Sequence, residues 1–301
     1  MNVCVLSGGV GGAKFVRALV ETLGGANVTA IVNVGDDVEA LGLHVSPDLD
    51  SVLYALAGLA DEERGWGRAD ETWHALETAS TLGGEDWFRL GDRDLGLHVV
   101  RTQALRAGEP LSAVTRRFAR SLGVEATLLA ATDDQLRTVV VTPAGEFEFQ
   151  HWFVARAHRD DVDAVRYEGD AVPAPGVIDA LERADMLLIA PSNPYVSIGP
   201  ILAVHGIREA LESRRVPCVA VSPLIGGRAV KGPADRMLQR LAGGTTPRHV
   251  TDCYRGLIDA VVIDEADDCD GLEVQPIVTR TLMTDSESRR RVAEAALAVP
   301  A

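Results

Sequence analysis

The sequence predicts an α/β fold in which a mostly parallel sheet carries helices on both faces. The first observation is a series of short β-branched runs at 3–6, 28–34, 127–131, 186–190, 216–221 and 260–264. The second is that helical patterns lie between many of these runs, an alternation that produces βαβ units and parallel strand pairing. The third is a glycine-rich turn directly behind the first run, where a strand would lead into a helix.

Helices are expected at 13–23, 49–60, 111–122, 177–183, 201–212 and 234–241. The segment from about 60 to 125 is helix-rich, and we expect it to form a lobe over the sheet. The stretch 136–154 departs from the alternation and predicts an antiparallel hairpin around Pro143-Ala144-Gly145. A last helix begins with a capping box at Ser286. Because the chain has 301 residues, 47% of them apolar, we expect one domain over 1–301.

Composition narrows the choice of partner and compartment. The net charge of −15 argues against a nucleic-acid partner, whose phosphates would be repelled. No apolar run approaches the roughly 20 residues of a membrane span, and the first residues do not resemble a secretory leader. The four cysteines are scattered, without the paired spacing of a disulfide framework or a zinc site. We therefore expect a cytoplasmic protein with no membrane partner.

The turn SGGVGGAK, residues 7–14, matches neither familiar phosphate-binding pattern. A Walker loop places Ser or Thr after its lysine, whereas Phe15 follows Lys14, and the dinucleotide pattern needs a glycine where Lys14 stands. A plain tight turn is the simpler interpretation. Glycines nevertheless allow close backbone approach, and a helix beginning near Ala13 would direct free N–H groups at an anion. We expect phosphate to bind at Gly8, Gly9, Gly11, Gly12 and Lys14.

The lysines support this expectation. The chain has 29 basic residues, but only Lys14 and Lys231 are lysines, and both follow glycine-containing loops. A lysine ammonium is a compact point charge, which suits a phosphate group. We therefore assign both lysines to phosphate binding.

Four aspartates fall at the same edge of the predicted sheet. Asp36 and Asp37 end the second strand, and Asp48 and Asp50 open the helix that follows. One carboxylate at a helix N-terminus is explained as a cap, but four together would repel unless a cation lay among them. One or two carboxylates, completed by phosphate oxygens and water, form the pattern that Mg²⁺ prefers.

Other loops end at this edge or close to it. The loops after 186–190 and 216–221 read PSNPYVSIGP and SPLIGGRAVKGPAD, and ligands of open parallel sheets bind at the carboxyl ends of the strands.

In LGDRDLGLH, Asp94 and His98 have helical i,i+4 spacing, for which a solvated surface ion pair is the expected role. The acidic stretch 264–271 has no regular ligand spacing and predicts a solvated loop.

Seven motifs in order along the chain resemble the 2-phospho-L-lactate transferase family (CofD/FbiA) of coenzyme F-420 biosynthesis. They are SGGVGGAK, VNVGDD, SPDLDSVLYALAG, RGWG with DETWHA, LGDRDLGLHVVRT, APSNPYVSIGPIL and SPLIGGRAVKGPAD, and they run to about residue 270. The resemblance implies a Rossmann-like, commonly dimeric transferase. Its substrates would be a guanosine diphosphate-linked donor, lactyl-2-diphospho-5'-guanosine or a related molecule, and the deazaflavin Fo. GMP would leave, and Mg²⁺ would be the cofactor.

The resemblance and the residues together assign roles within the site. We expect Mg²⁺ to be held by Asp36 and Asp48, and the donor diphosphate by Gly8–Gly12 with Lys14 and Lys231. Asp50 is the expected catalytic group that positions the attacking hydroxyl or accepts its proton. The remaining expected contacts are Arg93 to Fo or phosphate, Ser192 and Asn193 to the guanosine, and Tyr54 and Trp66 to the Fo ring; Leu53 is expected to be core.

Two other functions remain open from the sequence. The first is an NAD(P)-dependent oxidoreductase, although the third glycine of its fingerprint is missing. The second is a non-catalytic nucleotide-binding regulator, which leaves four aspartates beside one phosphate turn unexplained. Within the transferase reading, the donor acid is also open between phospholactate, phosphoenolpyruvate and phosphoglycerate.

Overall fold

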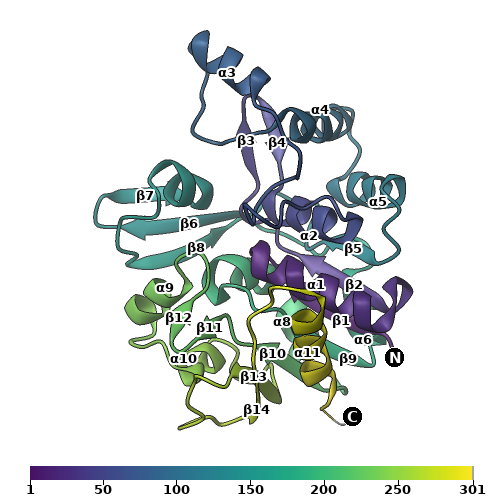
Figure 1. Cartoon of the computed structure of the whole chain (residues 1–301), viewed down its shortest axis with the longest axis vertical. Coiled ribbons are helices and arrows are strands. Elements are labelled where there is room, and N and C mark those ends of the chain that lie inside the picture. The colour runs from purple at the N-terminus through teal and green to yellow at the C-terminus, as the bar shows by residue number, and fades with distance from the viewer. Residues whose placement is uncertain (300–301) are drawn as a thin grey trace.

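The centre of the protein is a seven-stranded sheet in which every pairing is parallel (Figure 1). The computed structural model describes residues 1–299. Its strand order is β14-β13-β10-β9-β1-β2-β5. The strands are β1 (Val3–Ser7), β2 (Val28–Val32), β5 (Thr127–Ala130), β9 (Met186–Ile189), β10 (Cys218–Val221), β13 (Ala260–Asp264) and β14 (Gln275–Thr279).

The strand order reverses at the middle of the sheet. From β1 the chain builds outward through β2 and β5, and it then returns to the other side of β1 to add β9, β10, β13 and β14. Strands β1 and β9 are direct neighbours, paired from Val3↔Met186 to Leu6↔Ile189. Two adjacent parallel strands whose connections depart in opposite directions leave a crevice beyond their carboxyl ends, and open α/β sheets bind ligands there.

Helices cover both faces of the sheet, as the alternation predicts. One hydrophobic cluster includes residues of α1 (Gly9–Leu23), α2 (Pro47–Ala57), α5 (Leu111–Ser121) and α11 (Ser286–Leu297). The cluster on the opposite face includes residues of α6 (Val177–Arg183), α7 (Gly199–Ala203), α8 (Ile207–Glu212), α9 (Ala234–Leu241) and α10 (Pro247–Asp252). No helix of residues 1–299 has the length and apolar character needed to cross a membrane.

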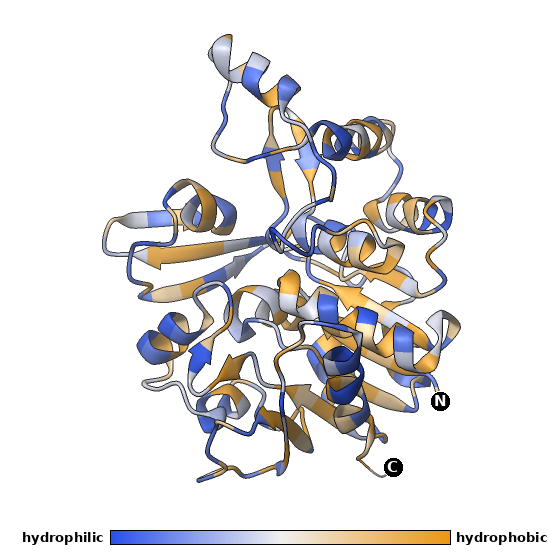
Figure 2. Cartoon of the chain, in the orientation of Figure 1, coloured by the Kyte–Doolittle hydropathy of each residue, from blue (hydrophilic) through white to orange (hydrophobic). Residues whose placement is uncertain are grey.

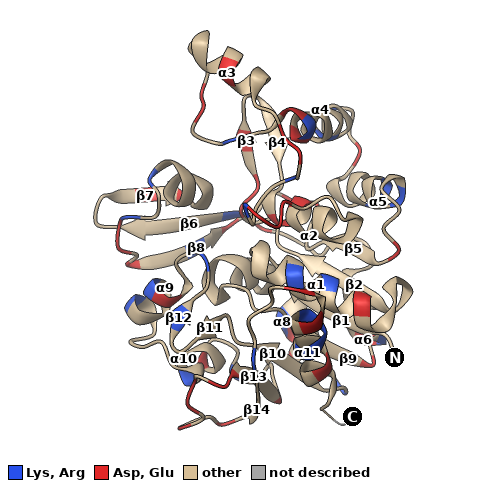
Figure 3. Ribbon diagram, in the orientation of Figure 1, with Lys and Arg blue, Asp and Glu red and all other residues tan. Residues whose placement is uncertain are grey.

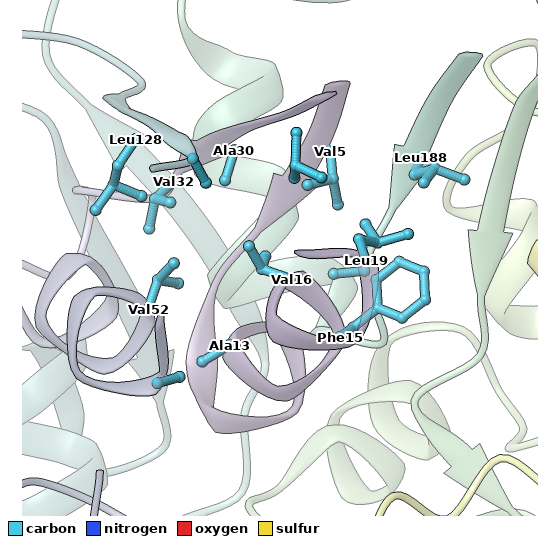
Figure 4. Packing of buried hydrophobic residues seen from close by; sticks show 14 of the residues in the cluster. Val5, Ala13, Phe15, Val16, Leu19, Ala30, Val32, Val52, Leu128 and Leu188 are labelled. Atoms are coloured by element: carbon cyan, nitrogen blue, oxygen red, sulfur yellow. The ribbon is translucent and has the colours of Figure 1, made fainter. Parts of the chain in front are cut away.

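Because side chains alternate along β1, the strand presents apolar side chains to both faces of the sheet, and helices must bury both sets. Val3 and Val5 belong to the first cluster, whereas Cys4 and Leu6 belong to the second. Figure 4 shows Phe15, Val16 and Leu19 of α1 packed toward Val5 and the neighbouring strands. The strands are correspondingly apolar along their length in Figure 2, and hydrophilic residues lie mainly on the outer helices and loops. A strand buried on both faces is expected to be continuously apolar.

Smaller elements stand above and beside the sheet in Figure 1. The upper lobe contains the hairpin β3–β4 (Val38–Ala40, Leu43–Val45) with α3 (His74–Thr81) and α4 (Asp92–Arg106). A separate three-stranded antiparallel sheet contains β6 (Arg137–Thr142), β7 (Gly145–Glu148) and β8 (Ala164–Glu168). The remaining elements are η1 (Gly25–Asn27), the π-helices η2 (His151–Ala155) and η3 (Pro194–Ile198), and the pair β11–β12 (Leu224–Ile225, Arg228–Ala229).

The sequence placed the six predicted strands within two residues of their observed bounds, and missed β14. The predicted helix 201–212 is wrong, because Gly206, with φ +82°, separates α7 from α8. The hairpin 136–154 ends early, since residues 151–155 form η2 and the sheet gains β8. The last helix is capped by Asp285, whose side chain accepts a hydrogen bond from the Ser288 N–H, and not by Ser286. In addition, α5 packs on β5 as well as on α4 of the lobe.

The helix after β1 begins at Gly9, four residues before the predicted start near Ala13. Gly9–Gly12 are therefore its first turn, with Gly8 as N-cap. Glycine is required at position 8 because other loops approach it closely. A Cβ there would lie 2.5 Å from Asp48 Oδ2 and 2.8 Å from the Ser197 Cβ.

We expect Gly8→Ala to lower the free energy of unfolding by about 1–3 kcal/mol, since neither crowding atom can move freely. Gly96→Ala is the matched control, because Gly96 lies inside α4 with nothing within 4 Å of its Cβ position. Alanine should stabilise that helix by about 0.5–1 kcal/mol. Urea unfolding of both variants measures the difference, and a Gly8→Ala protein as stable as wild type would contradict the close approach.

Candidate active site

A cavity of about 690 Å³ lies over the carboxyl ends of β1 and β9. The loops that follow β1, β2, β9 and β10 line it, together with α2, the lobe and the segment after β7. This volume is typical of sites for small organic ligands. The structure brings together nearly all predicted site residues as lining of this cavity, namely Gly8, Gly9, Gly11, Lys14, Asp36, Asp48, Asp50, Ser192, Asn193 and Lys231.

The glycine turn is held in place by one side chain of α2 and one from the loop after β9. The Gly9 N–H donates to Asp48 Oδ1 at 2.6 Å, so an aspartate of α2 caps the beginning of α1. Ser192 Oγ donates to the Gly8 carbonyl at 2.7 Å and lies 3.3 Å from the Gly8 N–H, for which it is the acceptor. The next N–H groups of α1 belong to a first helical turn, where no intrahelical acceptor exists. They remain suited to an anionic ligand.

Asn33 joins the two predicted metal ligands. Its Nδ2 donates to Asp36 Oδ1 at 3.0 Å and to Asp48 Oδ2 at 2.9 Å, and its Oδ1 accepts from the Gly35 N–H at 2.8 Å. The second Asp36 oxygen accepts from Gln150 Nε2 at 2.7 Å. Neither Asn33 nor Gln150 is among the predicted residues. For Asn33 the signal is its place in VNVGDD, between a buried strand and two aspartates.

Both carboxylates are buried in a way that disfavours their charge. Burial, followed by the charge of Asp48, raises the pKa of Asp36 well above its ordinary value. Burial also raises the pKa of Asp48 to about 6, although hydrogen bonds from Asn33 and Gly9 act in the opposite direction. Ionised carboxylates in such a place favour a nearby cation.

These carboxylates fit a Mg²⁺ site of the kind in which phosphate and water oxygens complete the coordination of the ion. Asp36 and Asp48 place carboxylate oxygens side by side on the cavity wall, where they could coordinate a cation. Within residues 1–299 there is no group of three or more His, Cys, Asp or Glu side chains arranged to hold a metal by themselves. A Mg²⁺ ion held by these two carboxylates would therefore need water or phosphate oxygens to complete its coordination.

The two lysines reach the same cavity from different elements, Lys14 from α1 and Lys231 from the loop after β12. Lys14 Nζ donates to the Met283 carbonyl at 3.2 Å, and Lys231 Nζ donates to the Gly65 carbonyl at 3.1 Å. Burial, and then the neighbouring Lys231 ammonium, lower the pKa of Lys14. Two cations that disfavour each other are stabilised by an anion placed between them.

Asp50 belongs to a buried ion pair. Arg101 holds both of its oxygens, with Nη1 at 2.9 Å from Oδ2 and Nη2 on Oδ1, and His98 Nδ1 lies 3.8 Å from Oδ2. A bidentate guanidinium fixes the position and the orientation of the carboxylate. Asp50 still lines the cavity, so it is placed to accept a hydrogen bond from a ligand. Arg101 is not among the predicted residues.

Some expectations need correction. Arg93 lies outside the cavity lining, with its side chain 55% exposed and Nη1 3.6 Å from Asp70 Oδ2; Arg89 lines the cavity instead. Gly12 is also outside the lining, because it packs under the hydroxyls of Ser7 and Ser192. The Asp94–His98 pair is not a solvated surface pair.

His98 is 1% exposed and its Nε2 lies 3.3 Å from Asp94 Oδ1 on the cavity wall. Tyr54 and Trp66, which were predicted to contact the Fo ring, line the cavity, and Leu53 is core as expected. Asn193 also lines it, but its Oδ1 accepts from the Tyr195 N–H and its Nδ2 contacts Met237 Sδ. Phe88, Phe149 and Phe153 are additional aromatic walls that were not predicted.

The carboxylate pair predicts how stability depends on Mg²⁺ and pH. Because burial raises the pKa of Asp48 from its ordinary value of 3.8 to about 6, the cation-free fold favours the protonated carboxyl. The free energy of unfolding therefore falls as pH rises from 3.8 through about 6. We expect Mg²⁺ to raise the Tm of the wild type at neutral pH and to have less effect below about pH 6. Asp48→Asn should abolish the Mg²⁺ shift and most turnover.

Asp268→Asn is the matched control, since Asp268 lies in the exposed acidic stretch away from the cavity. It should keep the Mg²⁺ shift of the wild type. Differential scanning calorimetry with Mg²⁺ or EDTA measures both, and an Asp48→Asn protein with an undiminished Mg²⁺ shift would remove this metal assignment.

Known proteins resemble the chain over its whole length. The family model described as "2-phospho-L-lactate transferase CofD" matches residues 3–289. A "Phosphoenolpyruvate transferase" of Streptomyces coelicolor is 43% identical and covers 99% of this chain and 97% of its own. Proteins of the same name from Nocardia farcinica and Mycolicibacterium smegmatis are 43% and 39% identical, over 98% and 99% of this chain and 94% and 98% of their own.

A solved structure has the same fold at low sequence identity. Protein BH3568 of Bacillus halodurans superposes with a TM-score of 0.66 and 19% identity, covering 98% of this chain and 99% of its own. A second structure of that protein, described as a member of the UPF0052 family, gives a TM-score of 0.65. The family match and the identity over the full length establish what the cavity geometry indicates: the chain belongs to the 2-phospho-L-lactate transferase (CofD) family.

Proposed function

We propose that this protein transfers a phosphoenolpyruvyl group from a guanosine diphosphate-linked donor to Fo in coenzyme F-420 biosynthesis, with Mg²⁺ as cofactor. The observation that supports the proposal best is the pair Asp36 and Asp48, joined by Asn33 beside the first turn of α1. The choice of phosphoenolpyruvyl over phospholactyl or phosphoglyceryl rests on the names of the relatives.

The reaction exchanges one phosphate ester bond for another. The terminal ribityl hydroxyl of Fo attacks the phosphorus that carries the enolpyruvyl group. A new P–O bond forms to the ribityl oxygen, the P–O bond to the bridging oxygen breaks, and GMP leaves with that oxygen. The hydroxyl proton passes to a nearby base or to water. Transfer of this kind depends on alignment and charge stabilisation more than on covalent help from the protein.

Three sets of groups would stabilise the negative charge of the donor diphosphate. Residues of the first turn of α1 line the cavity, and so do Lys14 of the same helix and Lys231 from the loop after β12. Mg²⁺ held by Asp36 and Asp48 would neutralise the charge that develops on the diphosphate. Because these groups are fixed by hydrogen bonds before a ligand arrives, little reorganisation is needed during the reaction.

The acceptor would bind toward the lobe. Tyr54 and Trp66 offer flat apolar surface to a tricyclic ring, and Asp50, aligned by Arg101, offers a carboxylate to the ribityl hydroxyls. The ion pair with Arg101 favours a role for Asp50 in positioning the hydroxyl, with any proton transfer late in the reaction. Arg89, which lines the cavity where Arg93 does not, is the cation proposed for this wall.

The oxidoreductase alternative is not favoured. Family membership extends over residues 3–289, and the first turn of α1 lacks the third glycine of a dinucleotide site. We further propose that the enzyme acts in the cytoplasm, which is supported by four free cysteines. A homodimer remains a prediction from the resemblance, which light scattering on the purified protein would test.

The test of the proposed function is a product assay. The purified protein, Fo and Mg²⁺ are incubated separately with the enolpyruvyl, lactyl and glyceryl forms of the guanosine donor, and the products are weighed by mass spectrometry. We expect GMP and an Fo mass increased by the phosphoenolpyruvyl group, fastest with the first donor. Conversion of the lactyl donor alone would contradict the proposed donor, and no conversion with any donor would contradict the function.

The position of Lys231 predicts which substrate it serves. Lys231→Ala should weaken GDP binding by about tenfold, the effect of removing one charge-assisted contact, and leave Fo affinity unchanged. Arg228→Ala is the control, since Arg228 is exposed on the same loop but outside the cavity lining. Titration calorimetry of both ligands decides the matter; a loss of Fo affinity with intact GDP affinity would assign Lys231 to the acceptor.

A further inference from the structure

Asp94, in the first turn of α4, presents one carboxylate oxygen to the cavity without a partner from the protein. The residue lines the cavity, and its side chain is 15% exposed. Its Oδ1 accepts a hydrogen bond from the Tyr54 hydroxyl and lies 3.3 Å from His98 Nε2. Its Oδ2 has no hydrogen-bond partner among residues 1–299 and is not sealed from solvent. One oxygen is therefore fixed by the protein, and the other can accept a hydrogen bond from a ligand.

The surroundings of Asp94 keep this carboxylate ionised. Burial alone would raise the pKa of Asp94, but the neighbouring His98 and Tyr54 groups and the charge of Arg101 outweigh it, so the pKa lies below its ordinary value. An ionised oxygen that is mostly buried and lacks a donor is unfavourable. A ligand that brings an O–H or N–H group to Oδ2 would remove that disadvantage.

Asp50, the other carboxylate on this side of the cavity, differs in its partners. Arg101 donates from Nη1 to Oδ2 at 2.9 Å and from Nη2 to Oδ1, so each oxygen of Asp50 already has a charged donor. A carboxylate oxygen accepts more than one hydrogen bond, so Asp50 can still meet a hydroxyl. The carboxylate that most needs a donor from a ligand is nevertheless Asp94.

The two carboxylates lie on either side of one imidazole. His98 Nδ1 is 3.8 Å from Asp50 Oδ2, and His98 Nε2 is 3.3 Å from Asp94 Oδ1. Tyr54, which holds Asp94, follows Asp50 by four residues on α2, a separation of about 6 Å along a helix axis. Asp50 and Asp94 are thus placed to meet different groups of one extended ligand.

The metal site fixes the order of these groups along the ligand. Asp48 contacts Gly9 and Asn33 at the edge of the sheet, whereas Asp94 belongs to the lobe. Asp50 comes two residues after Asp48 on α2. A polyol tail whose reacting end lies at the metal and Asp50 would therefore pass Asp94 with its inner part.

We propose that Asp94 is a specificity-determining residue for the acceptor, whose Oδ2 accepts a hydrogen bond from an inner hydroxyl of the ribityl tail. Asp50 meets the terminal hydroxyl that reacts. The inference rests on the proposed function, since it assigns a further contact to the acceptor Fo. A site built to bind a hydroxyl rejects an analogue that lacks it, because the buried polar group is then left without a partner.

The test compares two acceptors that share the ring and the reacting hydroxyl. One is Fo, and the other carries an ω-hydroxypentyl tail, which lacks the inner hydroxyls. Turnover is measured with the guanosine donor and Mg²⁺ for the wild type, Asp94→Ala and Asp94→Asn. We expect Asp94→Ala to raise KM for Fo about tenfold, as for a lost charge-assisted hydrogen bond, with little change in kcat. Its KM for the hydroxypentyl acceptor should equal that of the wild type.

Asp94→Asn tests the charge with less disturbance of the fold. The amide oxygen can still accept from the Tyr54 hydroxyl, so we expect a smaller rise of KM for Fo and again none for the hydroxypentyl acceptor. Glu77→Ala is the matched control. It removes a carboxylate from α3, where the Glu77 side chain is 73% exposed and outside the cavity lining, and it should leave both KM values unchanged.

The two acceptors separate a direct contact from a structural role. An equal rise of KM for both acceptors in the Asp94 variants would overturn the inference, because the effect would then not depend on the inner hydroxyls. An unchanged KM for Fo in both variants would also overturn it, as would a loss of GDP affinity in both, measured by titration calorimetry. A wild-type protein that converts neither acceptor would overturn the proposed function, and this inference with it.

Discussion

The arrangement of the site depends on one side-chain amide, that of Asn33. It donates to Asp36 and Asp48 together, and so keeps two buried carboxylates beside each other that would otherwise repel. Hydrogen bonds to charged groups stabilise by about 1.5–3 kcal/mol each, which makes this amide a strong local constraint. Asp48 in turn caps the first turn of α1, and Asp36 holds Gln150 of the segment after β7. Four parts of the chain are thereby fixed around one cavity.

This arrangement explains how an acidic protein can bind acidic substrates. The chain carries a net charge of −15, and in Figure 3 even α1 and α11, on the near face of the sheet, carry acidic beside basic residues. The cavity instead concentrates its attraction in Lys14, Lys231 and helix N–H groups, and its carboxylates favour a metal cation. A ligand that brings phosphate and Mg²⁺ together satisfies both sets of groups, whereas phosphate alone would face two carboxylates.

The parts of the site that were predictable from the sequence are those with a local pattern. Three local patterns identify site residues before the fold is known. They are the glycines behind a β-branched run, the two isolated lysines, and the aspartates at strand and helix ends. The sheet's switch point then brings them together. Gln150 and Arg101 were not predictable in this way, since each acquires its role only from a partner distant in the sequence: Gln150 and Asp36 are 114 positions apart, and Arg101 and Asp50 are 51 apart. Asn33 lies only 3 positions from Asp36, inside the same motif, and was overlooked although its place between strand and aspartates was visible.

Two other errors have similar physical causes. A single helix over 201–212 is consistent with its apolar pattern, but the left-handed Gly206 interrupts it. Arg93 shares a motif with cavity residues, yet the direction of α4 places its side chain toward solvent while His98 and Arg101 are buried. Spacing along a helix shows which residues share a face, but only the packing of that helix shows which face is buried.

The central claim is that Asn33 holds the carboxylate pair in the geometry that couples metal to nucleotide. The most direct test is the Mg²⁺ dependence of GDP affinity in Asn33→Ala, measured by titration calorimetry on protein whose fold is verified by circular dichroism. The account predicts that Mg²⁺ strengthens GDP binding to the wild type and has little effect on GDP binding to the variant. An equal gain of affinity from Mg²⁺ in both proteins would contradict it.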